Sequence, residues 1–210
     1  MAEASSGVAP GRVAEASSGV APAWRPVDEL AELVGSYCWV EHRIFELTGA
    51  WATGPMPPEG PSAGGELRVW CAAASRRHGA LAERWAERLP LRAGVDPAEL
   101  VRAPDGPLAG ALKALAAEPS GVVRFGVLVE IVLPRVAGVY GAHRRSGSPV
   151  SEGSVLEVLV EAQRELAAEI RGGRALLEGL GGASGQGRAI REAIERAFDA
   201  TRVFPAVRTS

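Results

Sequence analysis

Apolar residues recur along most of this chain at intervals of three or four positions, which is the period of a helix with one buried face. Strict alternation of apolar and polar residues, typical of a half-buried strand, does not run for any length. The chain is therefore expected to be all-α. The predicted helices cover 28–52, 66–88, 108–117, 120–143 and 151 to about 171, followed by a last amphipathic helix around Ile190, Ile194 and Phe198.

Capping and helix-breaking residues support these boundaries. Asp28 and Ser151 are good N-cap residues, and Asp96 followed by Pro97 favours a further helix start. The second long helix is followed by a connection of about 30 residues, which is long for a compact domain. Two hairpins of long helices joined by one long crossover form the ferritin-like variant of the four-helix bundle, with the last helix added to it.

Three ionisable residues lie on apolar helix faces. In the stretch YCWVEHRIFEL, Glu41 shares its face with apolar and weakly polar residues: Leu30, Val34, Tyr37, Ile44, Phe45 and Thr48. His78 lies at the centre of the apolar face of the second helix, and nearly every neighbour of Glu130 is apolar. We expect all three to be buried in one layer at mid-bundle. A buried carboxylate must be paired, protonated or bound to metal, because isolating it costs several kcal/mol.

The first hairpin carries a family resemblance. The segments LVGSYCWVEHRIFEL and AAASRRHGALAERW, followed by AGVDPAEL, resemble ferritin-like di-iron proteins, nearest the small ferritin-like proteins grouped with tRNA-ribozeatin hydroxylases. That family places a Glu on the first helix, Glu-x-x-His on the second, a carboxylate on the third and an acid-x-x-His on the fourth. The resemblance covers about residues 28–180 and implies that Glu41, His78 and Glu130 match ligand positions.

The chain departs from this pattern at two positions. Ser75 stands where the family has the second-helix Glu, and Arg164 stands where the second His belongs, with Glu161 at the acid. A hydroxyl cannot replace a bridging carboxylate, and a guanidinium cannot bind a metal. Rotation of the fourth helix alone gives a different register, in which Gln163 faces the core and Glu161 faces solvent. In both registers the dinuclear site is degenerate.

Two functions follow as expectations. The first is a binding or scaffold module with a non-catalytic, degenerate di-metal site, no cofactor, and Arg164 paired with Glu130 or Glu161. The alternative is a metal-dependent oxidase or hydroxylase with at most one Fe or Mn ion, held by Glu41, His78 and Glu161.

Composition limits the partners. The net charge of −2 at pH 7 gives no electrostatic footprint for nucleic acid, and no apolar run is long enough to span a membrane. Two cysteines make a poor disulfide framework and no signal peptide is evident, so we expect a cytoplasmic protein. The partner, a protein or a small molecule, is not specified. Trp39 lies opposite Glu41 and could contact a second subunit, which leaves a homodimer open.

The chain divides into three parts. Residues 1–26 form an expected disordered tail that contains the segment AEASSGVAP twice. Residues 27–200 form the bundle, and 201–210 form a C-terminal tail. Within the bundle, Pro134 should kink its helix, because it leaves the carbonyl of Glu130 without a helical hydrogen bond.

Overall fold

The computed structural model describes residues 25–54, 61–91, 94–181 and 187–203. Within these ranges all regular structure is helical, which confirms the all-α prediction. The elements are α1 (Val27–Thr53), α2 (Pro61–Ala86), α3 (Pro97–Leu100), α4 (Leu108–Ala117), α5 (Gly121–Val127), the π-helical turn η1 (Leu128–Val132), α6 (Leu133–Ser146), α7 (Gly153–Gly179) and α8 (Arg188–Asp199).

The helices begin and end close to the residues predicted from the apolar pattern, whereas only one of the three predicted N-cap residues caps a helix. Helix α4 begins and ends at the predicted residues, and α1 extends its predicted range by one residue at each end. Asp96 caps α3, since its carboxylate accepts a hydrogen bond from the amide of Ala98 at 2.9 Å. Asp28 and Ser151 do not cap helices, because α1 starts after Pro26 and α7 starts after Glu152.

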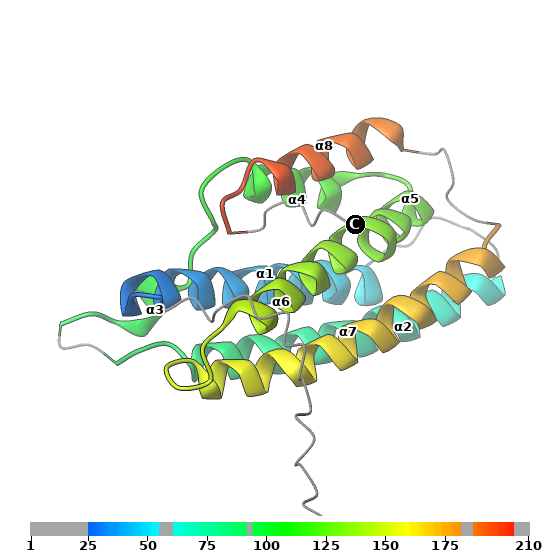
Figure 1. The fold of residues 1–210 in the computed structure, drawn as a ribbon. Coiled ribbons are helices and arrows are strands. Elements are labelled where there is room, and N and C mark those ends of the chain that lie inside the picture. The colour runs from blue at the N-terminus through cyan, green and yellow to red at the C-terminus, as the bar shows by residue number, and fades with distance from the viewer. Residues whose placement is uncertain (1–24, 55–60, 92–93, 182–186, 204–210) are drawn as a thin grey trace, which may run out of the picture.

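Four long helical segments form the body of the molecule (Figure 1). Helices α1 and α2 pack as one antiparallel hairpin, and α6 and α7 pack as a second. Helices α2 and α6 run in the same direction, because the connection between α2 and α5 returns along the length of the bundle. Helix α7 also contacts α2, so the two hairpins meet along these helices.

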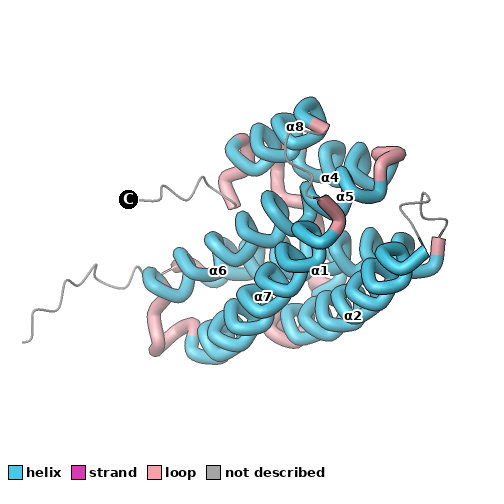
Figure 2. Tube along the Cα trace, turned by 90° about the vertical axis from the view of Figure 1, so that its right-hand side faces the viewer, coloured by secondary structure: helices cyan, strands magenta, loops and turns pink. Residues whose placement is uncertain are grey.

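The two shorter helices form a layer on one side of the bundle. Helix α8 packs against α4 and against η1, and both helices lie over α5 in Figure 2. The connection that leads to α4 is held close to α1 at Gly35, where a Cβ atom would lie 2.0 Å from the carbonyl oxygen of Leu100. This close approach requires glycine, and it brings α4 alongside the outer face of α1.

The third long segment is interrupted before Pro134, where the sequence predicts a kink. The interruption is the π-helical turn η1, closed by a hydrogen bond from the amide of Leu133 to the carbonyl of Leu128. Proline lacks an amide hydrogen, and a π turn is one way in which a helix adapts to the missing bond. The turn changes the rotation of residues along this helix relative to a regular α-helix.

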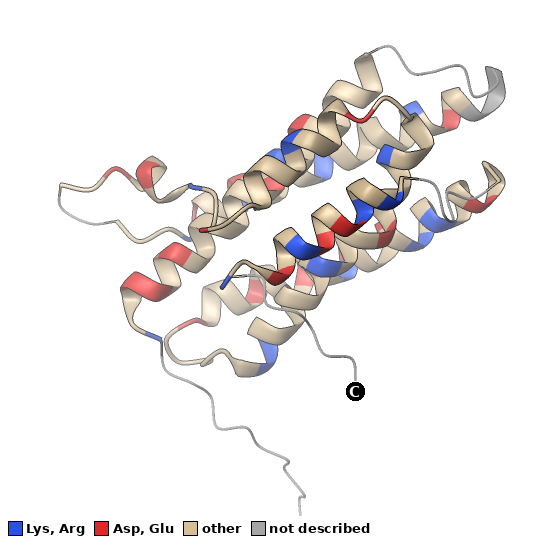
Figure 3. Cartoon of the chain, turned by 90° about the horizontal axis from the view of Figure 1, so that it is seen from above, with Lys and Arg blue, Asp and Glu red and all other residues tan. Residues whose placement is uncertain are grey.

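Several features predicted from composition can be compared with the structure. Cys38 and Cys71 form no disulfide, as expected from the sequence, and both are buried. Among the described residues, every helix is too short or too polar to cross a bilayer. Figure 3 shows acidic and basic positions interspersed along the helices. The duplicated AEASSGVAP segment and residues 204–210 lie outside the described residues.

Candidate functional site

Glu41 of α1 and His78 of α2 meet in the centre of the first hairpin. Their side chains are 0% and 1% exposed, and Nδ1 of His78 contacts Oε2 of Glu41. The other carboxylate oxygen of Glu41 accepts a hydrogen bond from the hydroxyl of Tyr140 at 2.5 Å. The indole of Trp85 donates to the same hydroxyl at 3.2 Å. Both oxygens of the Glu41 carboxylate are therefore partnered inside the bundle.

The third ionisable residue at this position is Glu169 of α7, which the sequence analysis does not predict. Its Oε1 lies 3.4 Å from Nε2 of His78, and it is also buried. Arg77 of α2 reaches the same carboxylate, with its Nε 3.2 Å from Oε2 and its Nη2 3.1 Å from Oε1. We call Glu41, Arg77, His78, Tyr140 and Glu169 the ionic core. With both carboxylates ionised and the imidazole protonated, its charges sum to zero.

The electrostatics favour the protonated form of His78. Burial alone would lower its pKa, but the negative charges of Glu41 and Glu169 outweigh burial and raise the pKa to about 10. Burial alone would raise the pKa of Glu169, but His78 and Arg77 hold it below the usual range. Burial and the neighbouring charge of Glu41 raise the pKa of Tyr140, so its hydroxyl remains a hydrogen-bond donor. The position of His78 between two carboxylates therefore favours the imidazolium at neutral pH.

Glu130 does not join the ionic core, and its predicted convergence with Glu41 and His78 is wrong. It lies in the π-helical turn, is only half-buried, and forms an ion pair at 2.6 Å with Arg191 of α8. Glu130 has apolar neighbours on every side in the sequence, so a regular helical period gives no information on the direction of its side chain. The π turn and the position of α8 decide that direction.

The second hairpin follows the rotation of helix α7 rather than the family pattern. Glu161 is exposed and pairs with Arg84 of α2, so its inward placement is wrong. Arg164 is also exposed and does not enter the core. Gln163 is half-buried and lies beside Gly141 of α6, with its Nε2 2.8 Å from where a Cβ of Gly141 would lie.

The position of Glu169 could have been found from the sequence. The buried residues of α7 follow one another in steps of three or four: Val155, Val158, Leu159, Ala162, Leu166, Glu169, Gly173 and Leu177. Glu169 continues this stripe. In the sequence, however, Glu169 also ends a ladder with Glu157, Glu161 and Glu165, and a glutamate at every fourth position is typical of a solvated helix face.

These residues do not fit a dinuclear metal centre. Such a centre in a helix bundle uses four carboxylates and two histidines that project into one cavity. Here one histidine and two carboxylates face one another directly, and the other two candidate carboxylates pair with arginines. Ser75 donates its hydroxyl to the carbonyl of Phe45 at 3.1 Å. Within the described parts of the chain, no group of three or more His, Cys, Asp or Glu residues is arranged to hold an ion.

A second buried polar chain lies near the end of the bundle. The hydroxyl of Tyr37 lies 3.1 Å from Nδ1 of His143, and Nε2 of His143 lies 2.6 Å from Glu152, which also pairs with Arg25. Burial lowers the pKa of His143, so this imidazole is neutral, with its proton on Nε2 facing the carboxylate. His143 therefore bridges the side chains of Tyr37 and Glu152.

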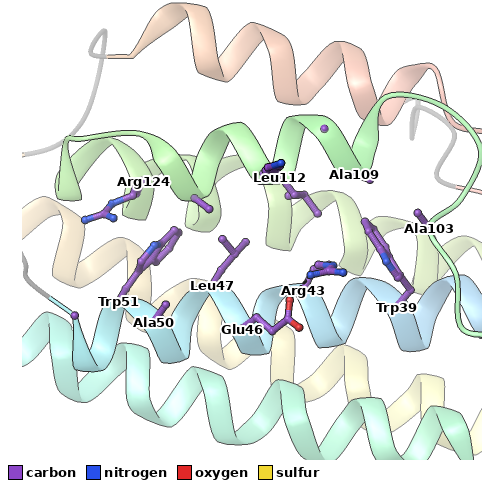
Figure 4. A pocket seen from close by; sticks show the side chains of 14 residues that line it. Trp39, Arg43, Glu46, Leu47, Ala50, Trp51, Ala103, Ala109, Leu112 and Arg124 are labelled. Atoms are coloured by element: carbon purple, nitrogen blue, oxygen red, sulfur yellow. Dashed lines mark hydrogen bonds and ion pairs between the residues drawn. The ribbon is translucent and has the colours of Figure 1, made fainter.

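A groove lies between α1 and α4, and we call it the α1–α4 groove. Its volume is about 870 Å³. Figure 4 shows Trp39 and Trp51 at its two ends, both projecting from α1 toward α4. Leu47 and Leu112 lie between them. Trp39, which the sequence analysis placed opposite Glu41 at a surface, is almost completely buried under α4.

Comparison of the chain with protein-family models, with curated proteins and with solved structures finds no match.

Proposed function

We propose that this protein is a ferritin-like bundle that has exchanged a metal centre for an ionic core, and that it acts as a non-catalytic binding module. Two features support the ferritin-like assignment. The long connection makes α2 and α6 run in the same direction, as in that variant of the four-helix bundle. In addition, a Glu of the first long helix and a His of the second meet at mid-bundle.

The observation that carries the non-catalytic assignment is that the charged side chains of the ionic core already face partners of opposite charge. A histidine binds a metal only through a neutral, unprotonated nitrogen. Both nitrogens of His78 face carboxylates, and these raise the pKa of the imidazole to about 10. Arg77 adds a permanent positive charge at Glu169, which opposes the entry of a cation.

The binding role is supported by the α1–α4 groove, which lies on the face of α1 opposite the ionic core. Its volume of about 870 Å³ is within the range of small-molecule sites, about 300–1,000 Å³. Two tryptophans and two leucines line it, which is typical of a ligand site with a mainly apolar wall. The ionic core fixes the helix that forms the floor of this groove.

The alternative function, a metal-dependent oxidase or hydroxylase with a single ion, is favoured by one observation. Nε2 of His78 and Oε1 of Glu169 are buried and lie 3.4 Å apart, and neither atom makes a contact with hydrogen-bond geometry within the described residues, although Nη2 of Arg77 lies 3.1 Å from Oε1. A neutral His78 could share an ion with Glu169 at this point. The two functions therefore differ in the metal content that they predict.

We expect fewer than about one iron or manganese ion per chain after purification, with or without added Fe(II) or Mn(II). Elemental analysis of the wild-type protein, of His78→Ala and of the surface control Arg84→Gln tests this expectation. Two ions per chain would contradict the degenerate centre. One ion that is retained in Arg84→Gln and lost in His78→Ala would favour the oxidase.

A further inference from the structure

The α1–α4 groove carries cationic side chains that lack anionic partners. Three cations and one carboxylate line it, and the carboxylate of Glu46 already contacts Arg43 on the same helix. Lys113 is exposed on α4, and no ion pair within the described residues joins it to a carboxylate. The guanidinium of Arg124 lies 5.5 Å from the ring centroid of Trp51. The groove therefore keeps two positive charges.

Arg124 is the more informative of these two cations. Its Nε atom is buried and has no hydrogen-bond partner within the described residues. The enclosed Nε is out of reach of a ligand, but Arg124 as a whole is half-buried and lines the groove, and a carboxylate is the strongest acceptor for a guanidinium. Figure 4 shows Arg124 beside Trp51 at one end of the groove. This end is suited to an anionic head group.

The rest of the groove is long and mostly lined by apolar residues, with the Arg43–Glu46 pair and Lys113 as its charged members. Trp39 and Trp51 are twelve residues apart on one helix, which corresponds to about 18 Å at the rise of an α-helix. Between them the lining contains leucine and small side chains: Leu47, Ala50, Ala109, Gly110, Leu112 and Ala116. Small residues leave room for a chain that lies along the two helices. The shape suits an extended apolar body better than a compact polar ligand.

We propose that the α1–α4 groove binds an amphipathic carboxylate with a long apolar chain, such as a fatty acid, with its head group at Arg124. This inference rests on the proposed function as a binding module and names the class of its ligand. The apolar chain lies along Leu47 and Leu112 toward Trp39, and Lys113 adds a second positive charge to the lining of the groove.

Three probes that share a chain and differ in charge test this proposal: laurate, dodecanol and dodecyltrimethylammonium, each below its critical micelle concentration. Binding is measured by calorimetry and by the fluorescence of the groove tryptophans. We expect laurate to bind at least about tenfold more tightly than dodecanol, and the cation to show no saturable binding. Arg124→Gln should weaken the binding of laurate about tenfold and leave the binding of dodecanol unchanged.

Two further variants locate the site. Ala50 is exposed in the groove, so Ala50→Trp should fill the groove without disturbing the core, and it should weaken both laurate and dodecanol. Arg84→Gln, outside the groove, should change neither. Circular dichroism checks that each variant is folded. Laurate binding that survives Ala50→Trp would overturn the groove as the site.

The outcomes separate the ligand class from the binding role. If dodecanol binds as tightly as laurate, or if the cation binds more tightly than laurate, the ligand is not a carboxylate. The proposed role as a binding module would still stand. Absence of saturable binding by all three probes would overturn this inference, and it would leave the broader binding role in place because that role is not limited to long-chain ligands. Tenfold preference for laurate, lost in Arg124→Gln, is the result that the groove predicts.

Discussion

Replacing His78 with alanine is expected to lower the free energy of unfolding by about 3–5 kcal/mol, which is typical when one partner of a buried ion pair is removed. The loss arises because Glu41 and Glu169 would then face each other without the cation between them. Urea-induced unfolding, followed by circular dichroism, measures it. In contrast, Arg84→Gln removes only an exposed ion pair with Glu161 and should cost less than about 1 kcal/mol.

The lower stability of His78→Ala could come from lost charge pairing or from lost packing, and a second variant separates these two causes. Replacing Glu41, His78 and Glu169 together with leucine removes the buried charges, and similar replacements elsewhere have been neutral or stabilising. Arg77, which is partly exposed, can then turn toward solvent. We expect the triple variant to be more stable than His78→Ala. A triple variant that is less stable than the single one would show that charge pairing in the ionic core does not explain the loss.

Stability is expected to fall as the pH rises above 7. The pKa of His78 is about 10 in the folded protein, above its ordinary value of 6.5. A group with a raised pKa contributes its full stability below the unfolded pKa, and the contribution is lost as the pH approaches the folded pKa. The free energy of unfolding should therefore fall by about 1 kcal/mol from pH 7 to pH 8 and by several kcal/mol by pH 10.

Between pH 7 and pH 8 the change in unfolding free energy reports most specifically on the titration of His78. Burial raises the pKa of Cys38 to about 11 and of Cys71 to about 12, so these thiols also destabilise the fold, but mainly above pH 8.5. The lowered pKa of His143 affects stability below about pH 6.5. Chemical unfolding at several pH values should show the slope in the wild-type protein and not in His78→Ala. An equal slope in both proteins would contradict the assignment to His78.

The helices could be predicted from the sequence because each has an apolar face with a regular period. Glu41 and His78 could be predicted for the same reason, since each interrupts such a face in a regular helix. Glu130 could not, because its helix is apolar on all sides and contains a π turn that changes the rotation. Glu169 is harder to identify, because it continues a ladder of glutamates spaced by four, of which Glu157 and Glu161 are exposed.

The α1–α4 groove depends on tertiary structure that the helical periods do not contain. Trp39 lies opposite Glu41 on α1, so rotation alone places it at a surface. Helix α4 covers this surface, and its position depends on the close approach of Gly35 to the connection before it. Likewise, the partners of Glu130 and Glu161 are arginines of helices whose packing the sequence pattern does not specify.

The protonation state of His78 is the most direct test of the ionic core, and nitrogen-15 NMR of the imidazole side chains measures it. At pH 8 we expect both ring nitrogens of His78 to be protonated, because its pKa is raised to about 10. His143, whose pKa is lowered, serves as the neutral reference in the same spectrum. A neutral imidazole at position 78 at pH 8 would contradict the ionic core and would leave this residue free to bind a metal ion.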